Sequence, residues 1–280
     1  MVTNRFVKKR LGRFTLWLAE PLADSPLQKA LSEGLASLAK TYSLSEVPAS
    51  KSADVYKFTY SDDSSMPGFY FKQYHYRSVW DFIKHTFRPG RARRTMQAAQ
   101  MLEANGFLSP AIAAMGYRRK WPFCVENFLL TYEVKNALPM YAFFSQNYER
   151  PASDFSFASK RNFIKAVGRF VGRLHSKNIS HGDLRLGNIL VRSSPNQQPS
   201  WKFFLLDNER TVQYLRLPNL LRLKNLVQCN MHRSPAITRT DRLRFFNSYL
   251  SENSSLAPAR KQWAKKIQRK TSRRLDKLGK

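Results

Sequence analysis

The distribution of apolar and polar positions favours β-strands from about residue 46 onward. Runs rich in strand-forming residues are separated by turn-forming residues, first at 61–65 and later around 118–122. This pattern predicts four strands, at 55–60, 69–74, 112–117 and 123–132.

Apolar residues follow the periodicity of an α-helix between and after these strands. The clearest helix is expected at 160–176, where six apolar residues follow the spacing of one buried helical face: Phe163, Ile164, Val167, Phe170, Val171 and Leu174. A helix at 91–105 ends at Asn105-Gly106, and another is expected near 25–40. Beyond residue 135 the chain is predicted to be mainly helical.

The order of these elements predicts an α+β protein with two lobes of different character and a boundary near 133–136. With 280 residues, 42% of them apolar, the chain can build the packed cores of two modest lobes. We expect four segments: an N-terminal extension at 1–45 without an assigned role, a β-rich lobe at 46–134, a larger, mainly helical lobe at 135–255 and a basic C-terminal helix at 256–280.

The charge of the chain changes this picture most. Lys and Arg number 48 against 19 Asp and Glu, a formal net charge of +29, which would attract nucleic acid, anionic lipid or a phosphorylated glycan. The segment 260–280 alone has ten basic residues and one acidic residue. It is expected to form a basic helix for a membrane surface or a polyanion, or else a frayed charged tail.

Other sequence features limit the compartment. Cys124 and Cys229 have no second Cys or His at ligand spacing, so both are predicted to be free thiols in a reducing compartment. No stretch reaches the roughly 18 apolar residues of a membrane span. Arg13 and Glu20 interrupt the apolar run near the N-terminus, so we also expect no signal peptide.

The chemistry is expected in the segment His181-Gly-Asp183-Leu-Arg185-Leu-Gly-Asn188, which follows the long amphipathic helix. An apolar strand then ends at Asp207, with Glu209 just beyond. Phosphoryl transfer requires mainly positioning and charge neutralisation. Asp183 could orient an acceptor hydroxyl and take its proton, while Asn188 and Asp207 could supply the few oxygen ligands that Mg²⁺ takes from protein. Arg185 could offset charge on the transferring phosphoryl group.

This segment resembles the catalytic loop of protein-kinase-like enzymes, with His-x-Asp followed by Asn at the same spacing. Gly182 in place of Arg is similar to the small-molecule kinases of that superfamily. The region 46–215 more narrowly resembles the bacterial lipopolysaccharide core kinases, the Kdo and heptose kinase group. Three features carry this likeness: Phe71-Lys72-Gln-Tyr, the basic stretch Phe87–Arg94 running into a helix, and Leu206-Asp207-Asn-Glu209-Arg210 in place of Asp-Phe-Gly.

The resemblance implies a protein-kinase-like bilobal fold and further roles. Lys72 would pair with the α- and β-phosphates of ATP, Glu133 would lie at the hinge that binds adenine, His181 would brace the loop, and Glu209 would assist the metal. The sequence departs from the family pattern at three places. The stretch Arg192–Ser200 makes the loop between Asn188 and Asp207 unusually long. Thr95 occupies the position of the helix Glu expected to pair with the lysine, with Gln97 or Gln100 as substitutes, and residues 49–53 replace the Gly-rich loop.

The resulting hypothesis is an ATP- and Mg-dependent kinase that phosphorylates a sugar hydroxyl, on Kdo or heptose, of the lipopolysaccharide inner core. It would be cytoplasmic and peripheral on the inner membrane, held at the anionic surface by its basic C-terminus. One alternative is a kinase-fold binding module without turnover, at an anionic membrane or polyanion. Another is a nucleic-acid-associated protein, which charge alone suggests and no RNA- or DNA-binding signature supports.

Overall fold

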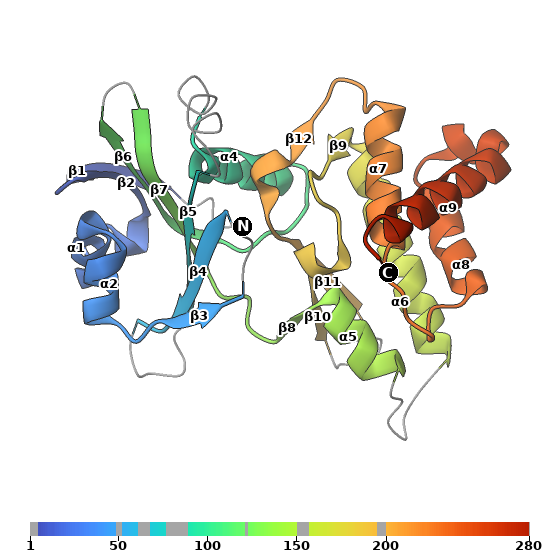
Figure 1. The fold of residues 1–280 in the computed structure, drawn as a ribbon, viewed down its shortest axis with the longest axis horizontal. Coiled ribbons are helices and arrows are strands. Elements are labelled where there is room, and N and C mark those ends of the chain that lie inside the picture. The colour runs from blue at the N-terminus through green and yellow to red at the C-terminus, as the bar shows by residue number, and fades with distance from the viewer. Residues whose placement is uncertain are drawn as a thin grey trace. The chain divides into compact units, whose positions relative to one another are not determined.

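The computed structural model describes residues 5–48, 52–60, 68–76, 89–120, 123–149, 157–194 and 200–279. The chain forms two compact units (Figure 1). The first unit comprises Met1–Gln97 and Pro110–Lys135, and the second comprises Ala98–Ser109 and Asn136–Lys280. The first is built on a β-sheet and the second is mainly helical, which confirms the predicted α+β class.

The first unit contains an antiparallel seven-stranded sheet in the order β1-β2-β6-β7-β5-β4-β3. Its strands are β1 (Phe6–Leu11), β2 (Phe14–Ala19), β3 (Ser45–Val47), β4 (Ala53–Phe58), β5 (Phe69–Tyr74), β6 (Ile112–Lys120) and β7 (Phe123–Tyr132). The predicted strands at 69–74 and 123–132 coincide with β5 and β7. The other two predicted strands correspond to β4 and β6 with shifted ends.

The two faces of this sheet differ because side chains alternate along each strand. On one face Phe71 of β5 joins an apolar cluster with Leu27 and Leu31 of α1 (Pro26–Glu33) and Leu38 of α2 (Leu35–Thr41). On the other face Tyr74 of β5 meets α4 (Arg91–Ala104). Lys72 lies two residues before Tyr74 and therefore shares the α4 face.

The segment 1–45 is not a separate extension, which corrects the expectation from the sequence. After a 3₁₀ turn (η1, Glu20–Leu22), α1 and α2 form the helical region expected near 25–40, but β1 and β2 precede it and β2 pairs with β6. The run Phe14–Ala19 is apolar and short, so its pattern suits a strand or a buried helix equally. Its partner β6 lies about a hundred residues later, and local sequence does not report that pairing.

The second unit combines helices with two small sheets, of strand order β11-β10-β8 and β12-β9. The strands are β8 (Ala137–Pro139), β9 (Ile179–Ser180), β10 (Ile189–Ser194), β11 (Ser200–Leu205) and β12 (Val212–Gln213). The α-helices are α5 (Met140–Phe144), α6 (Phe157–Ser176), α7 (Asn219–Asn230), α8 (Arg239–Leu250) and α9 (Arg260–Asp276). Shorter turns are η2 (Ser145–Glu149), η3 (Leu186–Asn188), η4 (Asn208–Arg210) and η5 (Ser254–Ala259).

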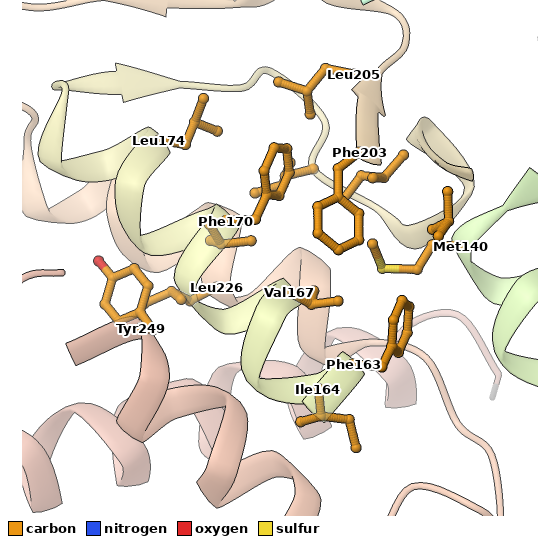
Figure 2. Packing of buried hydrophobic residues seen from close by; sticks show 14 of the residues in the cluster. Met140, Phe163, Ile164, Val167, Phe170, Leu174, Phe203, Leu205, Leu226 and Tyr249 are labelled. Carbon is orange, nitrogen blue, oxygen red and sulfur yellow. The ribbon is translucent and has the colours of Figure 1, made fainter. Parts of the chain in front are cut away.

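The apolar face of α6 forms the centre of the core of the second unit, as its periodicity predicts. Figure 2 shows Phe163, Val167 and Phe170 of α6 turned towards Phe203 of β11. The ring centroids of Phe170 and Phe203 are 4.9 Å apart. This packing holds β11, and with it the residues that follow the strand, against the helix.

The basic C-terminal segment forms α9, which packs against α7. Ile267, Thr271 and Leu275 are buried on α9, and Thr271 accepts a hydrogen bond from the side chain of Asn230 at 3.0 Å. Most of the basic residues of α9 are exposed: Arg260, Lys261, Lys265, Lys266, Arg269, Lys270 and Arg273. In the part of the chain that the structure describes, no helix has the length and apolar character needed to cross a bilayer.

Several expectations concern residues outside the described ranges. These are 49–51 in the segment that replaces the Gly-rich loop, the turn at 61–65, Phe87 and Arg88 in the basic stretch, residues 121–122, and 195–199. The sequence also suggested a long loop at 192–200, but residues 192–194 and 200 belong to β10 and β11. These two strands pair as an antiparallel hairpin.

Candidate active site

The predicted catalytic segment lies between β9 and the turn η3 and is fixed mainly by hydrogen bonds to its backbone. Asp183 is half-buried, and its backbone oxygen accepts a bond from Asn188 Nδ2 at 2.8 Å. The same amide nitrogen lies 3.3 Å from Asp183 Oδ2. The five-residue spacing therefore closes the loop on itself, which brings the candidate base and a candidate metal ligand together.

His181 is fully buried behind this loop. Its Nε2 donates to the carbonyl of Leu206 at 2.8 Å, and its Nδ1 accepts from the backbone N–H of Asp183 at 3.1 Å. Burial lowers the pKa of His181, so the ring is neutral at physiological pH. These contacts agree with the predicted bracing role, because one ring joins the catalytic loop to the residue before Asp207.

The strand register brings Asn188 and Asp207 to the same end of the β10–β11 hairpin. Ile189 is paired with Leu205, and the N–H of Leu206 donates to the carbonyl of Asn188 at 2.9 Å. Asn188 thus lies opposite the residue that precedes Asp207. The two predicted metal ligands are neighbours through backbone pairing.

Asp207 adopts the left-handed conformation, with φ 56° and ψ 47°. Few residues other than Gly, Asn and Asp take this conformation readily, and such positions cluster at functional sites. Asp207 is exposed, whereas Glu209 is buried. The Oε1 atom of Glu209 lies 3.6 Å from Nε of Arg210. The turn η4 therefore presents the Asp207 carboxylate outward and directs Glu209 into the protein.

Gly182 is required by a close approach of backbone to backbone. A Cβ at this position would lie 2.1 Å from the Cβ of Arg210 and 3.1 Å from its Cα. The space that a side chain would need is filled by the segment after Asp207. The glycine between His181 and Asp183 therefore lets the two halves of the candidate site approach each other.

The Asp183 carboxylate is held by two donors at one oxygen. Arg185 Nε lies 2.9 Å from Oδ1, and Gln228 Nε2 donates to the same oxygen at 2.8 Å. The Arg185 side chain is 54% exposed, so it can leave this ion pair at little cost. Gln228 is buried on α7 and keeps its place.

Helix α7 supports the catalytic loop, a role that the sequence analysis missed. Asn225 is fully buried; its Oδ1 accepts from the N–H of His181 at 3.1 Å and its Nδ2 donates to the His181 carbonyl at 2.6 Å. Lys224 donates to the carbonyl of Gly182 at 2.9 Å. The available signal was two amides three residues apart, Asn225 and Gln228, within a helix rich in leucine and valine.

Lys72 lies in the first unit on the α4 face of the sheet. Its Nζ is 5.3 Å from the centre of the Tyr74 ring, and the Arg91 guanidinium is 4.8 Å from the same ring. Thr95, at the position expected for a glutamate, is buried and lies 3.2 Å from the Tyr74 hydroxyl. The Tyr74 ring thus contacts both cations, while Gln97 and Gln100 are exposed.

Arg91 also binds Ser52, which lies in the described part of the segment that replaces the Gly-rich loop. Its guanidinium donates to the carbonyl of Ser52 at 2.7 Å, and both residues are buried. A charged side chain therefore fixes the start of β4, next to the residues expected to approach the phosphates.

Glu133 follows β7 at the end of the first unit. Its carboxylate pairs with Lys57 at 2.6 Å, and its N–H donates to the carbonyl of Gly68 at 2.7 Å. The backbone N–H of Glu133 is thus engaged in a hydrogen bond to Gly68. The carbonyl of Glu133 is then the backbone group that could contact the adenine base of a nucleotide.

Two groups of predicted site residues result. Asp183, Arg185, Asn188 and Asp207 converge in the second unit, and Lys72 and Glu133 belong to the first unit. The oxygen donors of Asn188 and Asp207 fit a hard cation such as Mg²⁺, because Asn188 uses its amide nitrogen on Asp183 and directs its oxygen elsewhere. No cluster of three or more His, Cys, Asp or Glu suited to a metal occurs among the described residues.

Comparison with known proteins supports the family suggested by the motifs. The model of the lipopolysaccharide kinase (Kdo/WaaP) family matches residues 50–249. The chain belongs to this family. Its matched range contains Lys72, Glu133 and the whole loop with Asp183, so the candidate site falls inside the region that defines the Kdo/WaaP family.

Individual relatives agree with this assignment. The lipopolysaccharide core heptose(I) kinase WaaP of Pseudomonas aeruginosa is 26% identical over 160 residues, which are 56% of this chain and 59% of that protein. The alignment thus spans about three fifths of the relative's length. A structure of WaaP in complex with acyl carrier protein superposes with a TM-score of 0.64 at 20% identity, over 92% of this chain and 98% of that chain.

The superposition on WaaP confirms the predicted protein-kinase-like fold. The Rio2 kinase of Chaetomium thermophilum, in an ADP/Mg²⁺-phosphoaspartate complex, superposes with a TM-score of 0.47 at 15% identity, over 96% of this chain and 82% of that chain. That likeness is too low to carry an argument.

Proposed function

We propose that this member of the Kdo/WaaP family is an ATP- and Mg²⁺-dependent kinase that phosphorylates a sugar hydroxyl of the lipopolysaccharide core. The observation that supports this most strongly is the convergence of Asp183, Asn188 and Asp207 at one end of the β10–β11 hairpin. A base and two oxygen ligands at this spacing are the groups that phosphoryl transfer needs from a protein.

Each residue then has a distinct task. Asp183 receives a hydrogen bond from the acceptor hydroxyl and takes its proton as the oxygen attacks the γ-phosphate. Asn188 and Asp207 would hold Mg²⁺, which when bound neutralises charge on the phosphates. Arg185, exposed beside Asp183, can turn to the transferring group and stabilise its negative charge. Lys72 would contact the α- and β-phosphates, and the carbonyl of Glu133 the adenine.

The acceptor follows from charge and family. A net charge of +29 favours an acceptor with phosphates or carboxylates, and the curated relative acts on a core heptose. The inner core is such an acceptor, and either Kdo or heptose offers a hydroxyl.

The site of action would be the cytoplasmic face of the inner membrane. Helix α9 packs against α7 and buries Ile267 and Leu275, so the face that it exposes to solvent is mainly charged. Attraction to an anionic leaflet would therefore be electrostatic and peripheral.

One observation favours the alternative of a binding module without turnover. Thr95 of α4, buried against the Tyr74 hydroxyl, occupies the position at which a kinase of this fold is expected to have a glutamate. A protein that binds Mg-ATP and transfers nothing would fit this alternative.

Transfer of label from γ-labelled ATP to purified lipopolysaccharide core acceptors tests the proposal. Asp183→Ala should reduce the rate by roughly 100- to 10,000-fold, the usual contribution of a general base, while ATP binding remains. Unchanged circular dichroism would show that the variant is folded. Equal rates in both proteins would refute the role of Asp183, and a folded wild type that binds ATP without labelling any acceptor would favour the binding module.

A further inference from the structure

The Asp183 carboxylate has two oxygens in different surroundings. Oδ1 receives Gln228 Nε2 at 2.8 Å and Arg185 Nε at 2.9 Å. Among the described residues, Oδ2 has only the longer approach of Asn188 Nδ2 at 3.3 Å. Saturation of Oδ1 leaves Oδ2 as the oxygen that can take a proton from an acceptor. The orientation of this carboxylate therefore decides where the acceptor hydroxyl must lie.

Of the two donors to Oδ1, only Gln228 is fixed. Its side chain is buried, with 3% of the residue exposed, and its Oε1 accepts from the N–H of Leu184 at 3.2 Å and from Asn225 Nδ2 at 3.0 Å. With two donors at the amide oxygen, the amide nitrogen must face Asp183. The side-chain orientation follows from its partners.

The support for Gln228 continues through the buried interior of the second unit. Asn225 Oδ1 lies 3.2 Å from Nε2 of the fully buried His175, whose Nδ1 lies 3.0 Å from the Tyr249 hydroxyl. Arg222 donates to that hydroxyl at 2.6 Å. Burial lowers the pKa of His175 to about 3, so the ring is neutral, with its proton on Nε2 and Nδ1 as acceptor. A continuous series of hydrogen bonds thus connects α6, α7 and α8 to the catalytic loop.

We propose that Gln228 is a positioning residue for the kinase reaction: it fixes the Asp183 carboxylate so that Oδ2 faces the acceptor while Arg185 moves to the phosphates. This inference rests on the proposed function. It assigns Gln228 no contact with ATP or the acceptor, because its nitrogen is used on Asp183 and its oxygen on Leu184 and Asn225.

Two variants separate this role from a structural one. Gln228→Glu keeps an acceptor oxygen for Leu184 and Asn225 but places a second carboxyl group against Asp183, so the two groups repel or share a proton. Gln228→Met removes the donor without adding a charge. The matched control is Gln213→Glu, the same change at an exposed glutamine of β12. We expect kcat to fall roughly 10- to 100-fold in both Gln228 variants, as for other residues that orient a catalytic group.

The split between kinetic constants decides the role. KM for ATP should stay within about twofold of wild type, because the lost interaction acts on the chemical step. Gln228→Glu should lower the melting temperature, because it buries a second carboxyl group beside Asp183, so Gln228→Met carries the kinetic test. Folded Gln228→Met with wild-type kcat would overturn the proposal, and the wild-type amide signal described next keeps it testable if that variant does not fold.

A second measurement needs no turnover. In ¹H–¹⁵N spectra the side-chain amide of Gln228, identified by its absence in Gln228→Glu, should be protected from solvent exchange and should shift in Asp183→Ala. A signal that Asp183→Ala leaves unmoved would overturn the contact and the proposal. The signal could also shift in Asp183→Ala while the wild-type protein phosphorylates no acceptor. That result would overturn the proposed function and the positioning role with it, but the hydrogen bond between Gln228 and Asp183 would stand.

Discussion

At the scale of single residues, Gly182 has the tightest surroundings in the candidate site. The backbone and Cβ of Arg210 fill the space where its side chain would be, although Gly182 itself has an ordinary negative φ. The requirement for glycine is therefore one of space and comes from the segment after Asp207.

Gly182→Ala should lower the free energy of unfolding by roughly 1–3 kcal/mol, the usual cost of overpacking, and should reduce phosphotransfer by displacing the loop. Denaturant titration measures the first effect. Gly187→Ala is the matched control for stability, because its Cβ would lie 3.7 Å from the ring of Tyr141, an ordinary contact. Equal loss of stability in the two variants would contradict this account.

His175 predicts how stability depends on pH. Burial lowers its pKa from 6.5 to about 3, so between these values the unfolded chain binds a proton that the native protein does not. Stability from this residue is complete above pH 6.5 and falls as the pH drops towards about 3, by at most about 1.4 kcal/mol per pH unit.

The variant His175→Gln should show a shallower decline of unfolding free energy below pH 6.5, measured by urea titration at several pH values. Part of the slope should remain, because burial also lowers the pKa of His181. The same slope in variant and wild type would contradict the assignment.

At the scale of elements, α6 and α8 pack closely because of two glycines. A Cβ on Gly168 would lie 2.4 Å from the carbonyl oxygen of Phe245, and one on Gly172 would lie 2.9 Å from the carbonyl oxygen of Tyr249. The helices can approach only where α6 has no side chain.

Gly168→Ala should destabilise the protein by roughly 1–3 kcal/mol, although alanine is the better helix former by about 1 kcal/mol. Thermal unfolding would show the sign directly. Arg169→Ala, at the adjacent exposed position, should change stability little. A more stable Gly168→Ala would mean that intrinsic propensity outweighs the contact.

Local pattern was sufficient for elements that carry their own signal. The periodicity of α6 and the strand-forming runs of β5 and β7 predicted these elements closely. The pattern failed for β1 and β2, where pairing with a distant strand decides the structure, and for the β10–β11 hairpin, where polar residues suggested a loop.

The candidate site divides in the same way. Asp183, Asn188 and Asp207 follow a short, recognisable spacing, and the structure brings them together. Asn225 and Gln228 act on the loop from more than forty positions away, so spacing within the loop contains no trace of them. The sequence placed Thr95 at the position of the expected glutamate, but it did not indicate that Lys72 and Arg91 both contact the Tyr74 ring.

At the scale of the whole molecule, the net charge of +29 is partly concentrated on α9. Lys265, Lys266 and Arg269 are exposed there while Ile267 is buried. This arrangement presents a charged surface without an apolar anchor.

Reversal of these three charges to glutamate should weaken binding to anionic phospholipid vesicles at least about 100-fold, at roughly 1 kcal/mol for each basic residue lost. Cosedimentation at low salt measures this, and high salt should abolish wild-type binding. The matched control reverses three exposed charges on α6, Lys165, Arg169 and Arg173. Equal losses would indicate a general charge effect, and binding to RNA but not to vesicles would favour a nucleic-acid partner.

The contacts of α7 have a consequence for how such enzymes diversify. Lys224 and Asn225 bind backbone atoms of His181 and Gly182, which every amino acid possesses. Of these three residues, Gln228 alone also binds a side chain within the loop 181–188, that of Asp183. Exposed positions of the loop can therefore exchange their side chains without loss of this support. Substitutions at those exposed positions can therefore change which acceptor is bound, while the hydrogen bonds from α7 to the loop backbone stay the same.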